Sequence, residues 1–304
     1  MAPVKNADIL ENSLRQAGDL LDILLTDQSI KKNIIWATDS YEQYGKAFEA
    51  HKQIKPGLVT GKYGKLIQPR AVKSREEQRQ RTKDKGEVFT PLEIVEQMNK
   101  LVDRVSVNKM NWQEYVSELK LEIACGEAPF IVSRYDPVAH GEVLGLKKRV
   151  GFLDRKLQIV TKYCATPKEW LRWARVAYQS SYGYEWQGDN LLIARENLLY
   201  TLIDYYSARF KKRPSLNVQE EFAEIVSWNI FQMDGLKYVI PMSCRHESKI
   251  VPGEWTLFEK ESDFVEKYEC EGCKYNRPNR HNGRYVKIMD WNRGAAIRFA
   301  DLLQ

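Results

Sequence analysis

Three cysteines and two histidines in the last quarter of the chain have the residue types and spacing of metal ligands. Cys270 and Cys273 stand in a Cys-Glu-Gly-Cys segment, and two thiolates at this spacing suit one half of a tetrahedral zinc site. Cys244 with either His281 or His246 would supply the other half, and the sequence leaves the choice of histidine open. We predict a zinc site at Cys244, Cys270, Cys273 and His281, with a redox pair or unliganded thiols as alternatives.

Such a zinc ion would be structural rather than catalytic. The surrounding stretch, residues 241–284, is rich in loop-forming residues and poor in apolar ones, so a metal would supply the cross-link that its own core cannot. A loop held in this way could also touch DNA phosphates, because it and the residues just after it are basic at Lys274, Arg277, Arg280, Lys287 and Arg293.

A second candidate site is the segment Leu-Glu-Ile-Ala-Cys-Gly-Glu-Ala-Pro-Phe at 121–130. We expect a buried strand to end on Glu122, a turn to form at Gly126, and a helix to begin near Pro129. Nucleotide-like ligands dock at such turns in open α/β sheets, because small residues let the ligand approach the backbone. By spacing alone, a plain packing corner explains the segment equally well, and the chain has no G-x-G-x-x-G fingerprint.

This segment resembles the cofactor motif of S-adenosylmethionine-dependent DNA methyltransferases, in particular of the N6-adenine type. Five residues match that motif: Glu122, Ala124, Cys125, Gly126 and Phe130; Ile123 and Ala128 depart from it. The upstream segment Gly-Glu-Val-Phe-Thr-Pro, ending in Phe89, Thr90 and Pro91, resembles the motif that precedes the cofactor turn in gamma-type enzymes. There it contacts the methionine part of the cofactor. The chain is thus similar to a methylase subunit of a restriction–modification system.

The resemblance also implies roles for two further acids, Asp234 and Asp290. The segment Asn-Ile-Phe-Gln-Met-Asp that ends on Asp234 looks like the family's second strand, whose terminal acid binds the ribose hydroxyls. Val-Lys-Ile-Met-Asp, ending on Asp290, looks like the third strand, whose acid binds the adenine amino group. The resemblance therefore implies cofactor contacts for both acids; taken singly, each could equally be a helix cap or a loop residue.

One part of the family pattern is missing. N6-adenine methyltransferases carry an Asn/Asp/Ser-Pro-Pro-aromatic loop that holds the flipped target base, and none of the 11 prolines here adjoins another. The sequence reaches Gln304 about where that loop would begin. The resemblance therefore implies methylation of adenine N6 in DNA only with a second polypeptide that supplies the loop. The alternatives are a non-catalytic regulatory module that binds DNA or protein, and a truncated relic.

The elements that must position these residues alternate between helix and strand. We predict helices at 7–25, after Pro91, around 129–135, and at 167–179, 189–210 and 217–229, with strands at 119–125, 230–233 and 285–289. The expected fold class is α/β: an incomplete Rossmann-like methyltransferase core. It would comprise an N-terminal helical and basic region, 1–85, and a cofactor-binding domain, 86–304, with a helical insertion at about 140–225.

The composition of the chain argues against a membrane-spanning, exported or disulfide-stabilised protein. The chain has 304 residues, 43% of them hydrophobic, and a formal net charge of +6. No signal peptide or apolar span long enough for a membrane is evident, and five cysteines do not make a disulfide framework, so a cytoplasmic protein without membrane contact is expected. Residues 62–85 hold nine basic residues against three acids, which predicts either a solvated helix surface or contact with the DNA backbone.

Overall fold

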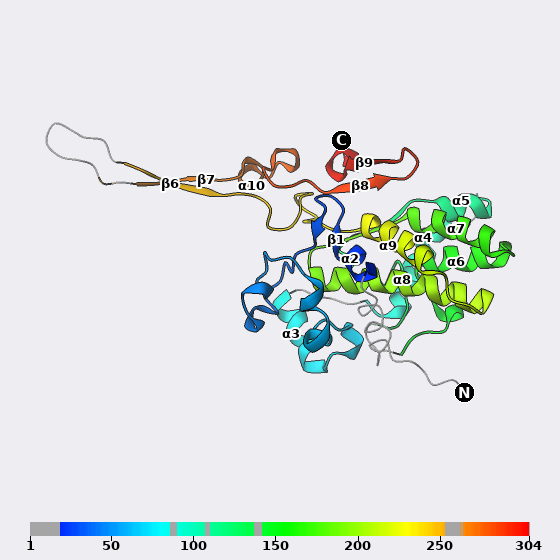
Figure 1. Ribbon diagram of the computed structural model, residues 1–304. Coiled ribbons are helices and arrows are strands. Elements are labelled where there is room, and N and C mark those ends of the chain that lie inside the picture. The colour runs from blue at the N-terminus through cyan, green and yellow to red at the C-terminus, as the bar shows by residue number, and fades with distance from the viewer. Residues whose placement is uncertain are drawn as a thin grey trace.

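A small parallel sheet wrapped by helices forms the body of the protein, and one long two-stranded arm leaves it (Figure 1). The computed structural model describes residues 19–85, 90–106, 110–136, 142–252, 262 and 264–303. The arm consists of β6 (Glu247–Val251) and β7 (Phe264–Tyr268), which pair antiparallel. Within these residues, no helix has the length and apolar character needed to cross a membrane.

The sheet has three parallel strands in the order β3–β4–β5: β3 (Lys120–Glu122), β4 (Ser181–Glu185) and β5 (Ile230–Gln232). Lys120 aligns with Ser181 in one pair, and Gly183 aligns with Ile230 in the other. The carboxyl ends of the three strands therefore meet at one edge. A mixed α/β fold is confirmed.

Long helical connections join these strands, as parallel pairing requires. α6 (Phe152–Tyr163) and α7 (Pro167–Gln179) lie between β3 and β4, and α8 (Gly188–Phe210) and α9 (Leu216–Asn229) lie between β4 and β5. The predictions for α7, α8, α9 and β5 are confirmed to within a residue or so. The predicted helical insertion at about 140–225 is wrong, because this segment contains β4, the middle strand of the sheet, and connections that belong to it.

Local sequence explains two of these helices. Thr166 accepts a hydrogen bond from the Glu169 N–H at 3.3 Å, and Pro167 occupies the first helical position of α7; both features favour a helix start. α8 is buried along nearly its whole length, the polar Arg195 and Glu196 included, and its many leucines fit a central core helix.

The helix predicted around 129–135 does not form. Residues 126–134 make successive turns, with left-handed backbone at Ala124 (φ 47°), Gly126 (φ 54°) and Ala128 (φ 62°). The Glu122 carboxylate accepts the N–H groups of Phe130 and Ile131. The carbonyls of Phe130 and Ile131, which a helix would use for its own hydrogen bonds, instead accept the N–H groups of Phe152 and Leu153, so the chain continues as a loop.

The N-terminal region belongs to the same core as the sheet. The predicted helix at 7–25 is present as α2 (Asp19–Leu25) within the described residues, and Trp36, Ile54 and Ile67 join the apolar cluster that contains the middle of α8. β1 (Thr26–Asp27) and β2 (Lys32–Asn33) form a short hairpin. Residues 19–67 are therefore packed as part of the body rather than as a separate unit.

Three further helices precede β3: α3 (Arg75–Lys85), α4 (Leu92–Ser106) and α5 (Trp112–Ser117). The predicted helix after Pro91 is confirmed as α4. Shorter 3-10 turns occupy Glu42–Tyr44, Lys46–Phe48, Pro56–Leu58, Gly61–Tyr63, Arg70–Val72, Leu146–Lys148, Pro278–Arg280 and Phe299–Leu303.

The last strands form a hairpin of their own. β8 (Lys287–Asp290) pairs antiparallel with β9 (Ala295–Arg298), after the short helix α10 (Glu271–Tyr275). Ile288 and Phe299 pack with Phe231 of β5 in a second apolar cluster. The strand predicted at 285–289 exists, but it is not the third strand of the parallel sheet; that place belongs to β5.

Candidate metal centre and strand-end acids

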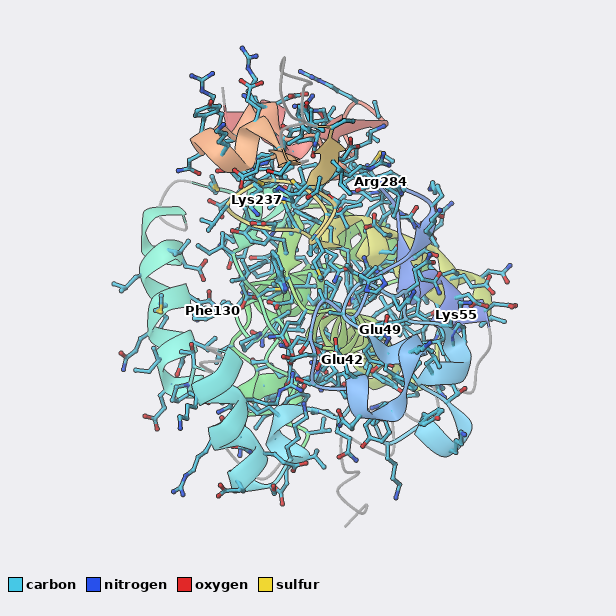
Figure 2. All side chains as sticks on the ribbon, turned by 90° about the vertical axis from the view of Figure 1, so that its left-hand side faces the viewer. Glu42, Glu49, Lys55, Phe130, Lys237 and Arg284 are labelled. Carbon is cyan, nitrogen blue, oxygen red and sulfur yellow. The ribbon has the colours of Figure 1, made fainter. Side chains whose placement is uncertain are left out.

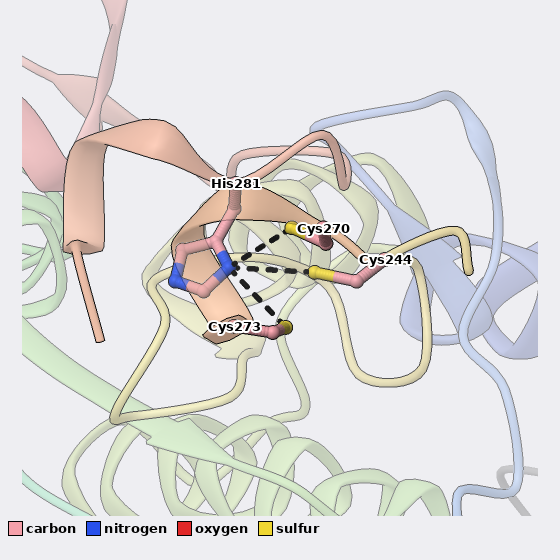
Figure 3. A group of neighbouring side chains, drawn as sticks. All are labelled: Cys244, Cys270, Cys273 and His281. Atoms are coloured by element: carbon pink, nitrogen blue, oxygen red, sulfur yellow. Dashed lines mark hydrogen bonds between the residues drawn. The ribbon is translucent and has the colours of Figure 1, made fainter. Parts of the chain in front are cut away.

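All four predicted metal ligands come together in one cluster. The ligand atoms of Cys244, Cys270, Cys273 and His281 lie within 4.8 Å of one another. Each of the three Sγ atoms is 3.6 Å from Nδ1 of His281; dashed lines mark these three contacts in Figure 3. The choice of histidine left open by the sequence is thereby decided, since His281 converges on the thiols and His246 is solvent-exposed.

These distances match tetrahedral coordination of zinc. With a Zn–S bond of about 2.3 Å and a Zn–N bond of about 2.0–2.1 Å, tetrahedral angles place sulfur and nitrogen about 3.5–3.6 Å apart. Three equal distances to a single ring nitrogen are what such a geometry requires. A Cys3His cluster of this shape can therefore hold a metal ion such as zinc.

Local structure around α10 builds the cluster. Cys270 immediately precedes the helix and Cys273 lies on it, while His281 follows the turn at Pro278–Arg280. A Cβ atom added to Gly272 would lie 2.6 Å from Cγ and Nδ1 of His281. The glycine inside the Cys-Glu-Gly-Cys segment is thus what lets the imidazole approach the two cysteines.

Neighbouring groups orient the ligands. The Asn282 N–H lies 3.3 Å from Sγ of Cys270. The Tyr285 hydroxyl accepts the His281 N–H and donates to the Pro278 carbonyl. Burial, together with the nearby Lys237 ammonium, lowers the pKa of His281, and this favours the neutral imidazole that a metal needs. Such supporting contacts fix a ligand's orientation and strengthen metal binding.

The cluster sits at the base of the arm. Cys244 lies three residues before β6 and Cys270 two residues after β7, so a bound metal would cross-link the two ends of the hairpin. In Figure 1 the arm departs from the body beside α10.

The second candidate site lies at the carboxyl edge of the sheet, where two buried carboxylates end adjacent strands. Glu122 ends β3 and Glu185 ends β4. Glu185 accepts the N–H of Gly126 at 2.8 Å and that of Gln187 at 3.1 Å. Burial, with a contribution from the Glu185 charge, raises the pKa of Glu122 to about 8.

Glu185 is the residue that sequence reasoning missed. Its strand reads Ser-Tyr-Gly-Tyr-Glu, with a glycine and no aliphatic residue, so its composition did not suggest a central strand. The available signal was the period-two alternation of tyrosine with Ser181, Gly183 and Glu185. The structure makes Glu185, not Asp234, the acid of the second strand.

Asp234 and Asp290 occupy a different kind of position. Asp234 follows the third strand, and its Oδ1 accepts the N–H groups of Leu236 and Lys237. Asp290 ends β8, and its Oδ1 accepts those of Asn292 and Arg293. Each acid caps its own turn. The prediction that Asp290 ends the third strand of the parallel sheet is corrected, since it belongs to the separate β8–β9 hairpin.

The remaining predicted residues surround the turn that follows β3. Cys125 is buried, and a Cβ on Gly183 of the neighbouring strand would lie 3.3 Å from its Sγ. α4 is tied to the turn because Asn99 donates to the carbonyls of Phe130 and Val150, each at 3.1 Å; Figure 2 labels Phe130 next to this helix. Ala124 is exposed.

The motif before α4 is only partly described. Thr90 and Pro91 directly precede the helix, and the Pro91 carbonyl accepts the N–H groups of Ile94 and Val95. Phe89 lies outside the described residues.

The basic run at 62–85 is partly internal. Arg81 of α3 pairs with Asp189 at 2.7 Å, and Asp189, at the start of α8, is fully buried. The Tyr41 hydroxyl donates to the same carboxylate oxygen at 2.7 Å. At least this arginine therefore holds α3 against the body.

Comparison with known proteins identifies no relative. No protein-family model matches the chain, and neither a curated protein nor a solved structure is significantly similar to it.

Proposed function

We propose that the chain binds S-adenosylmethionine at the carboxyl edge of its parallel sheet, on a Rossmann-like methyltransferase core. The observation that carries the proposal is the arrangement of Glu122, the turn at Gly126, and Glu185. A left-handed turn after the first strand stands beside a carboxylate at the end of the second strand. Ligands of open α/β sheets bind at this edge, and a carboxylate can accept two hydroxyl donors of a ribose.

The residues that would hold the cofactor follow from this arrangement. Gly126 and Ala124 would let it approach the backbone, Glu185 would accept from its ribose, and Asp234, at the end of the third strand, would accept from its adenine amino group. Phe130 is tied to α4 through Asn99, and Thr90 and Pro91, which directly precede that helix, would contact the methionine part of the cofactor. The bound cofactor would supply a sulfonium methyl group for transfer.

The reaction we propose is methylation of adenine N6 in DNA, as in restriction–modification systems, with a second polypeptide supplying the target-base loop. No Pro-Pro pair occurs within residues 1–304, so in this proposal the target-base loop lies outside this sequence. The protein's own contribution would be to position cofactor and base. The alternative is a non-catalytic module that keeps the cofactor site for a regulatory role.

Titration calorimetry with S-adenosylmethionine tests the site. We expect binding by the wild-type chain and at least a tenfold weaker affinity in Glu185→Gln and Asp234→Asn. Glu224→Gln, on the exposed side of α9, is the matched control and should bind normally. Absence of binding by the wild-type chain would reject both the enzyme and the cofactor-binding module.

A methyl-transfer assay on adenine-containing DNA tests the need for a partner. We expect no transfer by the chain alone, and methylation of DNA by the isolated chain would contradict this part of the proposal.

We further propose that the Cys3His cluster binds one structural zinc ion. The three 3.6 Å sulfur–nitrogen distances support it. Metal analysis after expression in zinc-supplemented medium should find one zinc per chain, and a substoichiometric content would reject the assignment.

A further inference from the structure

A cavity of about 550 Å³ lies beside the second half of α8. Its helical wall carries Asp204 and Ser207, and its other wall consists of residues 143–146 and Arg149. Asp204 comes sixteen residues after Gly188, so the cavity is about 24 Å along the helix from the carboxyl edge of the sheet. It has the size of an ordinary small-molecule site, and it is separate from the proposed cofactor site.

Two buried arginines share one carboxylate at this cavity. Arg149 is 3% exposed and Arg134 is 1% exposed. Nη2 of Arg149 donates to Oδ2 of Asp204 at 2.6 Å, and Nε of Arg134 donates to the same oxygen at 3.3 Å. The guanidinium of Arg134 also lies over the ring of Tyr200, 4.4 Å from its centroid. Two positive charges are therefore held in place against a single negative one.

Several donors of these groups have no acceptor. Arg149 lines the cavity, and its Nη1 is buried without a hydrogen-bond partner among the described residues. The Oγ of Ser207, on the α8 wall, is in the same state, as are Nη1 and Nη2 of the neighbouring Arg134. Unpaired buried polar groups are uncommon in folded proteins because each one costs stability. Their concentration at one cavity indicates that a ligand supplies the missing acceptors.

The surface around the cavity is basic. Arg213 lines the cavity and is exposed. Asp204 is the one acid among the described lining residues. Asp154, whose charge also acts on Arg149, is fully buried and is not among them. Four exposed lysines stand close to lining residues in the chain: Lys147, Lys148, Lys211 and Lys212. The charges around the cavity therefore favour an anionic ligand.

We propose that this cavity binds a small phosphate monoester, whose oxygens accept hydrogen bonds from Nη1 of Arg149, the Ser207 hydroxyl and the Arg213 guanidinium. Arginine forks match the geometry of a phosphoryl group. Three arginines against Asp204 leave two positive charges in excess. A phosphate monoester, with a charge of about −1.5 to −2 at pH 7, comes close to neutralising them, whereas a carboxylate would neutralise only one. Apolar side chains such as Ile203 would contact the organic part of the ligand.

Titration calorimetry on the full chain at low ionic strength tests this site, with phenyl phosphate as the probe. We expect one saturable site per chain and a rise in melting temperature with ligand concentration. The affinity should fall at least tenfold in Arg213→Gln, which removes an exposed guanidinium, and about fivefold in Ser207→Ala, which removes one hydrogen bond. Arg172→Gln, at an exposed arginine of α7 outside the cavity, is the matched control and should bind normally.

The buried arginine is tested by Arg149→Lys, which keeps the positive charge but removes Nη1. Its affinity for phenyl phosphate should also fall at least tenfold. The melting temperature of the variant without ligand shows whether it folds, and the exposed Arg213→Gln decides the matter if it does not.

Three outcomes would overturn the proposal. These are no saturable binding of phenyl phosphate by the wild-type chain, wild-type affinity in Arg213→Gln, and a preference for benzoate over phenyl phosphate, which would assign the cavity to a carboxylate. Because S-adenosylmethionine carries no phosphate, calorimetry with that cofactor tests the other site independently.

An oligonucleotide with a 5′ phosphate, compared with the same strand without it, identifies the source of the phosphate. Weaker binding of both strands than of phenyl phosphate would support a small ligand. Tighter binding of the phosphorylated strand, lost in Arg213→Gln, would contradict the small-molecule assignment and give the site to the end of a nucleic acid.

Discussion

The metal centre and the carboxyl edge of the sheet are built in opposite ways. The four metal ligands lie within 38 consecutive residues, and a helix, a turn and one glycine bring them together. At the sheet edge, Gly126 and Glu185 are 59 positions apart in the sequence, and only the pairing of β3 with β4 makes them neighbours. The residues of a site built from local turns can be predicted from their spacing in the sequence. The residues of a site built by strand pairing cannot, because they are far apart in the sequence.

Of the two sites, we expect the metal centre to be the more sensitive to substitution of a single residue. Replacing Cys270 with serine removes one of four ligands, and we expect zinc affinity to fall by more than about a hundredfold, beyond the 10–100-fold typical of supporting residues. Competition with a chromophoric chelator measures this. Hydrogen exchange in β6 and β7 should rise as the base of the arm loosens.

Cys164→Ser is the control for that variant, because Cys164 is a buried cysteine outside the cluster. It should keep full zinc content. Retention of wild-type zinc affinity by Cys270→Ser would show that the cluster is not the binding site.

The buried Glu122 at the carboxyl edge of the sheet should make the stability of the protein depend on pH. The pKa of Glu122 in the folded protein is about 8, above its ordinary value of 4.5, so the folded state binds more protons than the unfolded state between these values. The contribution of Glu122 to the free energy of unfolding should therefore fall as pH rises toward 9, by several kcal/mol, and the difference between the wild type and Glu122→Gln isolates it from the opposite contribution of the buried Lys156, whose pKa is lowered by burial. Urea denaturation at intervals from pH 5 to 9 measures the slope.

Glu122→Gln should remove most of that slope above pH 6. Asp154, whose pKa burial raises to about 6, would still contribute a decline at lower pH. An unchanged slope between pH 6 and 9 in Glu122→Gln would show that another group carries the effect.

The buried pair of Arg81 and Asp189 tests how α3 attaches to the body. Arg81→Met leaves the Asp189 carboxylate buried without its counter-charge, and such changes cost about 3 kcal/mol. The exposed Arg79→Met in the same helix should change stability little. Urea denaturation of the two variants provides the comparison, and equal stabilities would argue that Arg81 is dispensable for folding.

The smallest expected effect concerns the glycine of the metal centre. Gly272→Ala pushes the His281 ring away from the cysteines, and we expect zinc affinity to fall about tenfold, as for other residues that orient ligands. Gly145→Ala, where an added Cβ meets nothing within 4 Å, is the control. Unaltered affinity in Gly272→Ala would mean that the loop carrying His281 adjusts freely.

Sequence patterns were most informative where the interactions are local. α7 and α9 could be predicted from their sequence pattern, and the cysteine spacing predicted the candidate metal ligands. The helix expected at 129–135 failed because Phe152 and Leu153, which are distant in sequence, donate their N–H groups to the Phe130 and Ile131 carbonyls that a helix would use. The sequence showed the apolar stripe of α4, but it did not show that Met98, Leu101 and Val102 of this stripe are exposed.

By itself, then, the sequence determined the helices α4, α7, α8 and α9, an α/β pattern, and three of the four candidate metal ligands. The tertiary structure decided that His281 rather than His246 completes the cluster, that Glu185 ends the second strand, and that Asp290 lies outside the parallel sheet. The physical reason is the range of the forces involved. Helix periodicity and ligand spacing act over a few residues, whereas strand order follows from burying distant apolar segments together.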